Sequence, residues 1–213
     1  MKTLFIEAKY TGKISLTNEA VSHIPNRIGL LTTVQFAFQI EDIKSQLIGK
    51  KVIVPKGKQK HYAQVLGCDV SASEAIKDKV DAFLYIGSGE FHPLGIALKT
   101  GKTVFCFNPL TSEFSEINQK DVENHKKRKK GALIRLISSK SVGILVSTKP
   151  GQANLKKAIE LKEKLTDKDC YIFAFDTLNI PELENFNFID CWINTACPRI
   201  EGRGIIGSDE ITF

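Results

Sequence analysis

The sequence of 213 residues carries a formal net charge of +6, and its 42% hydrophobic and 25% charged residues are typical of a soluble globular protein. No stretch approaches the roughly 18 consecutive apolar residues of a membrane span, and the first residues turn charged too soon for a signal peptide. We therefore expect a cytoplasmic protein without membrane association, folded as one large domain or two small ones.

Apolar runs of strand length recur through the first half of the chain, at residues 4–10, 27–34, 51–55, 64–68, 81–86 and 104–107. The run at 27–34 is nearly continuous, which is typical of a strand buried on both faces of a parallel sheet. Helical spacing appears at 36–48 and again at 94–99. A parallel α/β domain is the expected result.

Two turns of this half carry features of a binding edge. Ser71 and Glu74 resemble a capping box, which would direct a helix N-terminus at the loop that holds Cys68. Gly87, Ser88 and Gly89 follow a strand and precede a helix, so the backbone could approach a ligand closely there. A tight strand-to-helix turn explains the glycines equally well.

The second half repeats the pattern after a long charged helix at 119–139. Its expected strands lie at 142–148, 170–174 and 188–193, and its helices at 152–165 and 180–185. The segment from Gly143 resembles the segment from Gly29, since both are apolar runs that end in hydroxyl residues and a Gln. The predicted fold class is therefore α/β: two repeated parallel-sheet domains with helices on both faces, at 1–117 and 118–213, joined by a long basic helix.

The basic helix contains His125 followed by five consecutive cations at 126–130. A solvated helix face is the simplest interpretation, and a patch that meets RNA or an acidic protein surface is the alternative. No aromatic residues interleave with the cations, so direct nucleic-acid binding is not expected.

The five cysteines are odd in number and unevenly spaced, and no C-x-x-C occurs, so neither a disulfide framework nor a zinc ribbon is indicated. Cys106, Cys170 and Cys191 lie in or beside apolar runs and are expected to be small buried side chains. Cys68 and Cys197 instead adjoin glycine or proline after a strand, at the ligand-binding edge of a parallel sheet. We therefore expect Cys68 and Cys197 to be ligands of a shared iron–sulfur cluster.

Hydroxyl and amide side chains are predicted to lie along the same edge, where they could bind the carboxylate and ammonium of an amino acid or serve only as turn residues. These side chains are Thr32, Thr33, Gln35, Ser88, Ser147, Thr148 and Gln152. His92 is either a site residue or a loop histidine bonded to backbone, and Arg199 could pair with a carboxylate or tune a cluster. With Gly87 and Gly89, these residues form the candidate cofactor-binding set, and no side chain is assigned a catalytic role.

Five segments in order resemble the family of 2-(3-amino-3-carboxypropyl)histidine synthases, the first-step enzymes of diphthamide biosynthesis. They are residues 27–35, 64–68, 87–95, 143–152 and 194–200. The resemblance implies three similar α/β domains, each giving one cysteine to a [4Fe–4S] cluster that binds S-adenosylmethionine. It also implies a transferase of the non-classical radical S-adenosylmethionine type, which adds a 3-amino-3-carboxypropyl group to a histidine of translation elongation factor 2.

The resemblance places Cys68 in the family's second domain and Cys197 in its third, and it leaves the first domain and its cysteine without a counterpart in this sequence. A separate polypeptide could supply that domain, the chain could be a shortened paralogue, or another group could be the third ligand. A homodimer or a heteromer with a first-domain chain is expected. The remaining alternatives are a non-catalytic partner subunit of a catalytic paralogue and a plain α/β ligand-binding protein.

Overall fold

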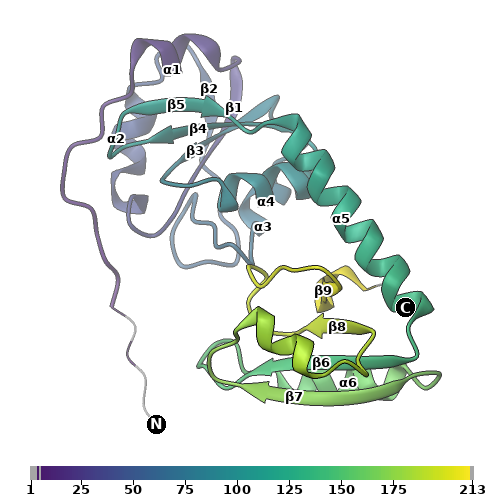
Figure 1. The fold of residues 1–213 in the computed structure, drawn as a ribbon. Helices are drawn as coiled ribbons and strands as arrows, with labels where there is room; N and C mark the ends of the chain where they lie inside the picture. The colour runs from purple at the N-terminus through teal and green to yellow at the C-terminus, as the bar shows by residue number, and fades with distance from the viewer. Residues whose placement is uncertain (1–3, 5, 212–213) are drawn as a thin grey trace. The chain divides into compact units, whose positions relative to one another are not determined.

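The computed structural model describes residues 4 and 6–211, and it shows an α/β chain divided into two compact units, Met1–Glu123 and Asn124–Phe213. Each unit contains one β-sheet (Figure 1). The division falls within the long helix α5 (Gln119–Ser138), a few residues beyond the expected boundary at 117. The assignment of the two units to the family's second and third domains stays a prediction.

Unit 1 is built on a five-stranded sheet with the order β2-β1-β3-β4-β5, in which only β5 is antiparallel to its neighbour. Its strands are β1 (Arg27–Thr32), β2 (Lys51–Ile53), β3 (Ala82–Ile86), β4 (Thr103–Asn108) and β5 (Glu113–Glu116). Its helices are α1 (Asn18–His23), the 3₁₀ turn η1 (Ala37–Gln39), α2 (Ile40–Ser45), α3 (Ser71–Glu74) and α4 (Phe91–Thr100).

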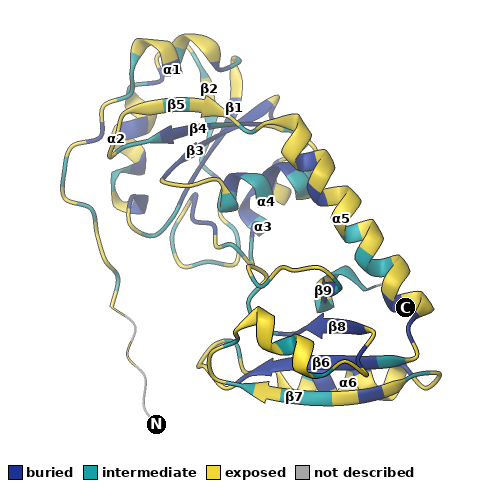
Figure 2. Cartoon of the chain, viewed as in Figure 1, coloured by how far each residue is buried: buried dark blue, intermediate teal, exposed yellow. Residues whose placement is uncertain are grey.

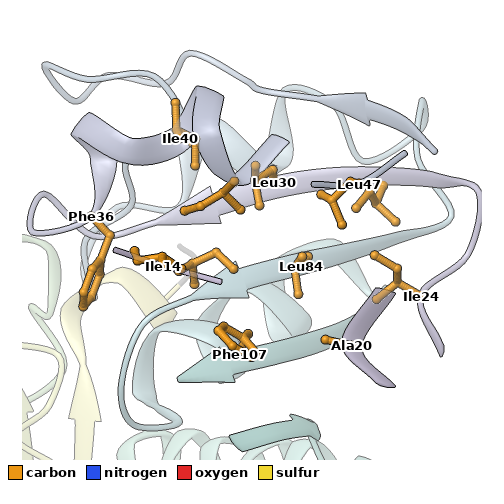
Figure 3. Packing of buried hydrophobic residues seen from close by; sticks show 13 residues of the cluster. Ile14, Ala20, Ile24, Leu30, Phe36, Ile40, Leu47, Leu84 and Phe107 are labelled. Atoms are coloured by element: carbon orange, nitrogen blue, oxygen red, sulfur yellow. The ribbon is translucent and has the colours of Figure 1, made fainter. Parts of the chain in front are cut away.

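Side chains from the strands of unit 1 alternate between two hydrophobic clusters, one on each face of the sheet. Leu30 and Leu84 pack with Ile40 of α2 on one face (Figure 3). Leu31 and Phe83 pack with Ile96 of α4 on the other face. Because both faces are covered, the central strands are buried throughout, which explains their nearly continuous apolar sequences. Figure 2 shows these strands in the colour of buried residues.

Unit 2 has a four-stranded, fully parallel sheet with the order β7-β6-β8-β9. Its strands are β6 (Ser141–Ser147), β7 (Asp169–Phe175), β8 (Cys191–Asn194) and β9 (Ile205–Gly207). The α-helix α6 (Leu155–Lys164) lies between β6 and β7, the 3₁₀ turn η2 (Ile180–Asn185) lies between β7 and β8, and the 3₁₀ turn η3 (Ser208–Glu210) follows β9. Ala158 of α6 and Leu136 of α5 pack with Ile144 in one cluster, while Leu145 and Trp192 belong to another.

The predicted repeat is confirmed by the strand order, because β2, β1, β3 and β4 correspond in sequence order and position to β7, β6, β8 and β9. The central strand of each unit carries a glycine opposite an aromatic residue of the next strand. Gly29 pairs with Phe83, and Gly143 pairs with Trp192. A Cβ at either glycine would collide with the facing ring, so both glycines are there to admit an aromatic side chain.

Some sequence-based elements are wrong. Residues 4 and 6–10 form no strand, and Phe5 lies outside the described residues. The expected helix at 36–48 is η1 followed by the shorter α2. Two strands were not expected from the sequence: the edge strand β5, in which only Phe114 is partly buried, and β9 in the glycine-rich segment that begins at Glu201.

The expected capping box at Ser71 is also wrong, because Val70 is the N-cap residue of α3 and makes no side-chain cap bond. The Ser71 hydroxyl instead accepts a hydrogen bond from the Lys58 backbone N–H at 3.0 Å. The Ser71 backbone N–H donates to Asp69 Oδ1, so an aspartate rather than the serine organises this turn.

Candidate functional site

The loop that carries Cys68 begins where the chain returns to the carboxyl end of β1. Thr32 N–H donates to Ala63 O and Val65 N–H donates to Thr32 O, both at 2.9 Å, as in a parallel sheet. The expected strand at 64–68 is therefore a single bridge that resumes the line of β2. Residues 56–62 form an excursion from that line, closed by the Ala63 N–H to Pro55 O bond of 2.6 Å.

Cys68 lies exposed in a four-residue turn. Leu66 and Asp69 exchange backbone hydrogen bonds of 2.9 and 3.1 Å, which leaves Gly67 and Cys68 between them. The Asp69 carboxylate accepts hydrogen bonds from Gln59 Nε2 at 2.6 Å and from the Ser71 N–H at 3.0 Å. Partial burial alone would raise the pKa of Asp69, but these bonds outweigh it and hold the pKa below its usual value. The ionised carboxylate of Asp69 thus fixes the end of the turn that follows Cys68.

A series of aromatic contacts connects the Cys68 turn to the interior of unit 1. A Cβ at Gly67 would collide with the ring of Phe91, so this glycine lets the turn lie directly on that ring. Phe91 contacts His92 edge-on at a centroid distance of 5.6 Å, and His92 stacks on Tyr85 at 5.9 Å with an angle of 17° between the rings. The candidate residue His92 thus lies between the cysteine turn and β3.

The other candidate residues of unit 1 divide between buried and exposed positions. The buried Thr32 hydroxyl donates to Ile86 O at 2.7 Å, joining the ends of β1 and β3. Gly87 is buried, with its N–H donating to Phe107 O, whereas Ser88 and Gly89 are exposed and Gly89 has a φ of 72°. Gln35 is exposed, and its backbone carbonyl accepts from the Tyr10 N–H.

Cys197 lies half-buried in the loop after β8, and Asn194 holds that loop. The Asn194 Nδ2 group donates to Cys197 O at 2.8 Å and to Ile200 O at 3.2 Å, while its Oδ1 accepts from the Ala196 N–H at 2.9 Å. Thr195 Oγ1 donates to Leu145 O at 2.8 Å. The cysteine backbone is therefore fixed by side chains that are almost completely buried.

The remaining candidates of unit 2 surround the end of β6. Ser147 is buried and its hydroxyl accepts from the Lys149 N–H at 3.1 Å. Thr148 Oγ1 donates to Asp176 Oδ1 at 3.3 Å. Gln152 N–H donates to Lys149 O in the turn that follows, and Arg199 lies exposed two residues after Cys197.

The three other cysteines are buried, as predicted. Burial raises the pKa of the Cys106 thiol to about 12 and that of Cys191 to about 11, and it also raises the pKa of Cys170. Thiols held neutral in apolar surroundings are poor metal ligands, whereas Cys68 and Cys197 lie on turns that reach solvent. These two fit thiolate ligation of a cluster, but no group of three His, Cys, Asp or Glu side chains suited to a metal ion occurs among the described residues.

The basic helix presents most of its cations to solvent, since Lys126, Lys127, Arg128 and Lys130 are exposed. Lys129 pairs with Glu210 at 2.7 Å, and the buried His125 lies 3.7 Å from Glu201. Burial is the main cause that lowers the pKa of His125. None of the helices in the described part of the chain is long and apolar enough to cross a membrane.

Sequence reasoning missed several residues that shape the site. Asp69 and Asn194 were visible beside the cysteines, and an Asx residue next to a turn is a known sign of side-chain-to-backbone bonding. Asn154 and Tyr85 gave no such sign. Asn154 donates to Thr195 O at 2.7 Å, and this partner lies in a distant segment of the chain. The Tyr85 hydroxyl has no hydrogen-bond partner among the described residues.

Comparison with known proteins places these features in a family. Residues 1–202 match the family model described as "Putative diphthamide synthesis protein". Proteins named 2-(3-amino-3-carboxypropyl)histidine synthase are similar: that of Methanocaldococcus jannaschii is 29% identical over 94% of this chain and 56% of its own length. That of Pyrococcus horikoshii is 31% identical over 84% of this chain and 52% of its own length.

Two crystal structures of Dph2 from Pyrococcus horikoshii resemble this chain. The one with a 4Fe-4S cluster has a TM-score of 0.75 at 28% identity, covering 89% of this chain and 57% of that one. The other has a TM-score of 0.78 at 27% identity, covering 93% and 61%. The chain thus spans about half the length of the relatives it matches.

Proposed function

Because this chain belongs to the family of diphthamide synthesis proteins, we propose that it is a subunit or short form of 2-(3-amino-3-carboxypropyl)histidine synthase. In this role Cys68 and Cys197 are two ligands of a [4Fe–4S] cluster. The carrying observation is the contrast among five cysteines: these two lie on turns fixed by Asp69 and Asn194, while the other three are buried. A relative of similar fold was crystallised with such a cluster.

When bound, the cluster would supply one electron that breaks the bond between the sulfur and the methionine γ-carbon of S-adenosylmethionine, leaving methylthioadenosine. The 3-amino-3-carboxypropyl group would pass to a histidine of translation elongation factor 2, which would give up one proton and return one electron. The chain's own residues would bind and orient the reactants. Hydroxyl, amide and backbone groups at the strand ends, from Thr32, Thr33, Gln35, Gly87, Ser88, Gly89, Ser147, Thr148 and Gln152, would bind the amino-acid part of S-adenosylmethionine. His92 and Arg199 would complete the polar surroundings.

Cys106, Cys170 and Cys191 are unsuited to be the third cluster ligand, because they are buried and burial raises the pKa of each thiol. That ligand would then come from outside these 213 residues. The working form is then a homodimer or a heteromer with a chain that supplies the family's first domain. Elongation factor 2 is the protein substrate, which places the reaction in the cytoplasm.

Anaerobic iron–sulfur reconstitution tests the cluster. We expect a brown protein that loses most of its iron and visible absorbance in Cys68→Ala and in Cys197→Ala. Cys170→Ala is the matched control, because this cysteine is buried in β7, and it should keep the wild-type iron content. A wild-type protein that stays colourless, with or without a first-domain chain, would contradict the proposal and favour a plain α/β ligand-binding protein.

A second assay separates the enzyme from a supporting subunit. The chain is incubated with dithionite, S-adenosylmethionine and elongation factor 2, alone and with a first-domain chain, and the mass of the factor is measured. An increase by one 3-amino-3-carboxypropyl group supports the enzyme. If the cluster forms but the mass never increases, the chain is a non-catalytic partner of a catalytic paralogue.

A further inference from the structure

Two hydroxyl groups at the carboxyl edge of unit 1 are buried without a hydrogen-bond partner among the described residues. They are Tyr85 OH and Thr33 Oγ1. Leaving a buried polar group unsatisfied costs roughly 1–3 kcal/mol, so native proteins rarely keep such groups without a reason. Their occurrence on the ends of two neighbouring strands suggests one shared reason.

The Tyr85 ring leans along β3 toward the edge of the sheet. A Cβ built on Gly87 would lie 2.5 Å from the Tyr85 hydroxyl oxygen, so the glycine leaves the space that this hydroxyl occupies. Thr33 follows Thr32, and Gly87 follows Ile86, directly after the last paired residues of β1 and β3. Both hydroxyls therefore lie at the same end of these two strands.

The phenol of Tyr85 is held as a hydrogen-bond donor. The side chain is completely buried, and His92 stacks on its ring. Burial and the neighbouring Cys106 raise the pKa of Tyr85 well above its ordinary value, so the hydroxyl keeps its proton under all physiological conditions.

The equivalent positions in unit 2 do have partners. Tyr85 is opposite Leu31 in the register of unit 1, and Asn194 is opposite Leu145 in unit 2, so Tyr85 corresponds to Asn194. Asn194 makes three hydrogen bonds to its own loop. Thr33 corresponds in the same way to Ser147, which accepts from the Lys149 N–H. The fold itself therefore does not require these groups to stay unpaired.

We propose that Tyr85, with Thr33, binds the carboxylate of an amino-acid ligand at the edge of unit 1. Two hydroxyl donors suit an anionic oxygen. The helix α4 has ten residues and no side-chain cap, and its first turn, with its positive end, lies beside Tyr85, since His92 stacks on that ring. The exposed carboxylate of Glu90 at that helix start complements an ammonium group. Gly87 adjoins the Tyr85 hydroxyl and is followed by the exposed residues Ser88 and Gly89, so ligand entry to the buried hydroxyl requires this turn to move aside. This assignment rests on the proposed function, under which the ligand is S-adenosylmethionine.

The test is a calorimetric titration of the reconstituted full-length chain, together with any first-domain chain it needs, with S-adenosylmethionine and with its decarboxylated analogue. The variants are Tyr85→Phe, Gly87→Ala, which displaces the Tyr85 hydroxyl, and Tyr171→Phe as a control. Tyr171 is half-exposed on β7 in unit 2 and loses the same atom outside the site. Iron content and thermal unfolding of the unliganded proteins are measured in parallel.

Tyr85→Phe should weaken S-adenosylmethionine binding roughly ten-fold or more, the effect of a hydrogen bond to a charged group. Gly87→Ala should weaken it similarly, and Tyr171→Phe should leave it unchanged. The decarboxylated analogue should bind wild type and Tyr85→Phe with equal affinity. The iron content of Tyr85→Phe should equal that of wild type, and its melting temperature should not fall.

Equal binding of S-adenosylmethionine by wild type and Tyr85→Phe would overturn this inference and leave the proposed function intact. An equal loss of affinity for both ligands would overturn the assignment to the carboxylate. A lower melting temperature with unchanged affinity would make Tyr85 structural. A wild-type protein that holds its cluster but binds neither ligand would overturn the proposed function, and this inference with it.

Discussion

The two units place different chemistry on the same backbone positions. At the carboxyl end of β3 stands Tyr85, a buried hydroxyl without a partner among the described residues, and at the equivalent position of β8 stands Asn194, which bonds three backbone groups. Thr33 and Ser147 differ in the same way. Unit 2 uses these two positions to bond its own backbone, whereas unit 1 leaves the two hydroxyls without a partner among the described residues.

The difference follows from where each cysteine is attached. Cys197 lies on the loop directly after β8, so the edge of β8 must fix that loop. Cys68 lies on the segment that resumes the line of β2, where Asp69 fixes the turn instead. The Tyr85 hydroxyl at the end of β3 therefore has no loop to hold in unit 1. We infer that a repeated fold can divide the tasks of one strand position, with the ligand's carboxylate bound at the end of β3 and a loop anchored at the end of β8.

The largest effect is expected from Asn194→Ala, which tests whether Asn194 anchors the loop of Cys197. It removes three hydrogen bonds from an almost completely buried side chain, so the free energy of unfolding should fall by about 2–4 kcal/mol. Urea unfolding measures the change. Asn179→Ala is the control, because that side chain makes one exposed bond to Glu182 and should cost far less.

A loss at Asn194 no larger than at Asn179 would mean that the loop of Cys197 is held by other contacts. The proposed division of tasks would then fail for unit 2. It would stand or fall separately for unit 1, where Tyr85→Phe is the corresponding change.

A somewhat smaller effect is expected from Gly143→Ala, which tests the shared part of the two units. The new Cβ would collide with the ring of Trp192, the register partner of Gly143. The free energy of unfolding should therefore fall by about 1–3 kcal/mol. Gly29→Ala should act in the same direction through Phe83.

Gly131→Ala is the matched control in α5, because nothing lies within 4 Å of the added Cβ. In a helix interior this change should stabilise the protein by roughly 0.5–1 kcal/mol. Opposite signs at Gly143 and Gly131 in the same thermal unfolding experiment would support the packing argument, and equal signs would refute it.

The smallest expected effect concerns the amino edge, where Asp81 and Asp190 occupy equivalent positions before β3 and β8. Asp190 Oδ2 accepts from the Lys140 and Ser141 N–H groups at 2.9 Å, and the bonds from these two residues lower its pKa. A carboxylate with a depressed pKa stabilises the fold above its unfolded pKa, and this contribution is lost as the pH falls through the folded value.

Asp190→Asn should therefore lower the melting temperature near pH 7 slightly and narrow its difference from wild type as the pH drops below about 4. Thermal unfolding at several pH values measures this. Asp78→Asn, at an exposed turn of unit 1, serves as the control. A difference between Asp190→Asn and wild type that stays constant with pH would contradict the assignment.

Sequence reasoning succeeded where a local pattern has one physical cause. The nearly continuous apolar run at 27–34 predicted a strand buried on both faces, and the similar apolar run at 142–148, which also carries a glycine, indicated the repeat. The burial of Cys106, Cys170 and Cys191 followed from their apolar neighbours. The separation of Cys68 and Cys197 from these three followed from glycine or proline beside them.

Reasoning failed where the outcome depends on residues distant in sequence. The segment 64–68 has a strand-like composition, but of its residues only Gln64 bridges to β1, because Thr32 is the last residue of that strand. Leu66 bridges only to Asp69 within the Cys68 turn. β9 forms because residues 205–207 pair in parallel with Trp192 and its neighbours in β8. No local pattern in this part of the sequence predicts that pairing. In the sequence, Tyr85 is indistinguishable from an aromatic residue of the core. Its candidate role in binding becomes visible only from its buried hydroxyl, which has no hydrogen-bond partner among the described residues.

The excursion at 56–62 is a loop whose two ends are fixed ahead of Cys68. Pro55 and Ala63 are joined by a backbone hydrogen bond, so the chain leaves the sheet and returns at a fixed place. Doubling the length of such a loop costs only about 0.6 kcal/mol in closure entropy. Lys58 and Gln59 of the excursion bond to Ser71 and Asp69 beside the cysteine, so an insertion should leave Cys68 in place only where it spares these two bonds. An inserted fluorescent reporter or affinity tag should therefore be placed beside the exposed Tyr62 and not beside Lys58 or Gln59.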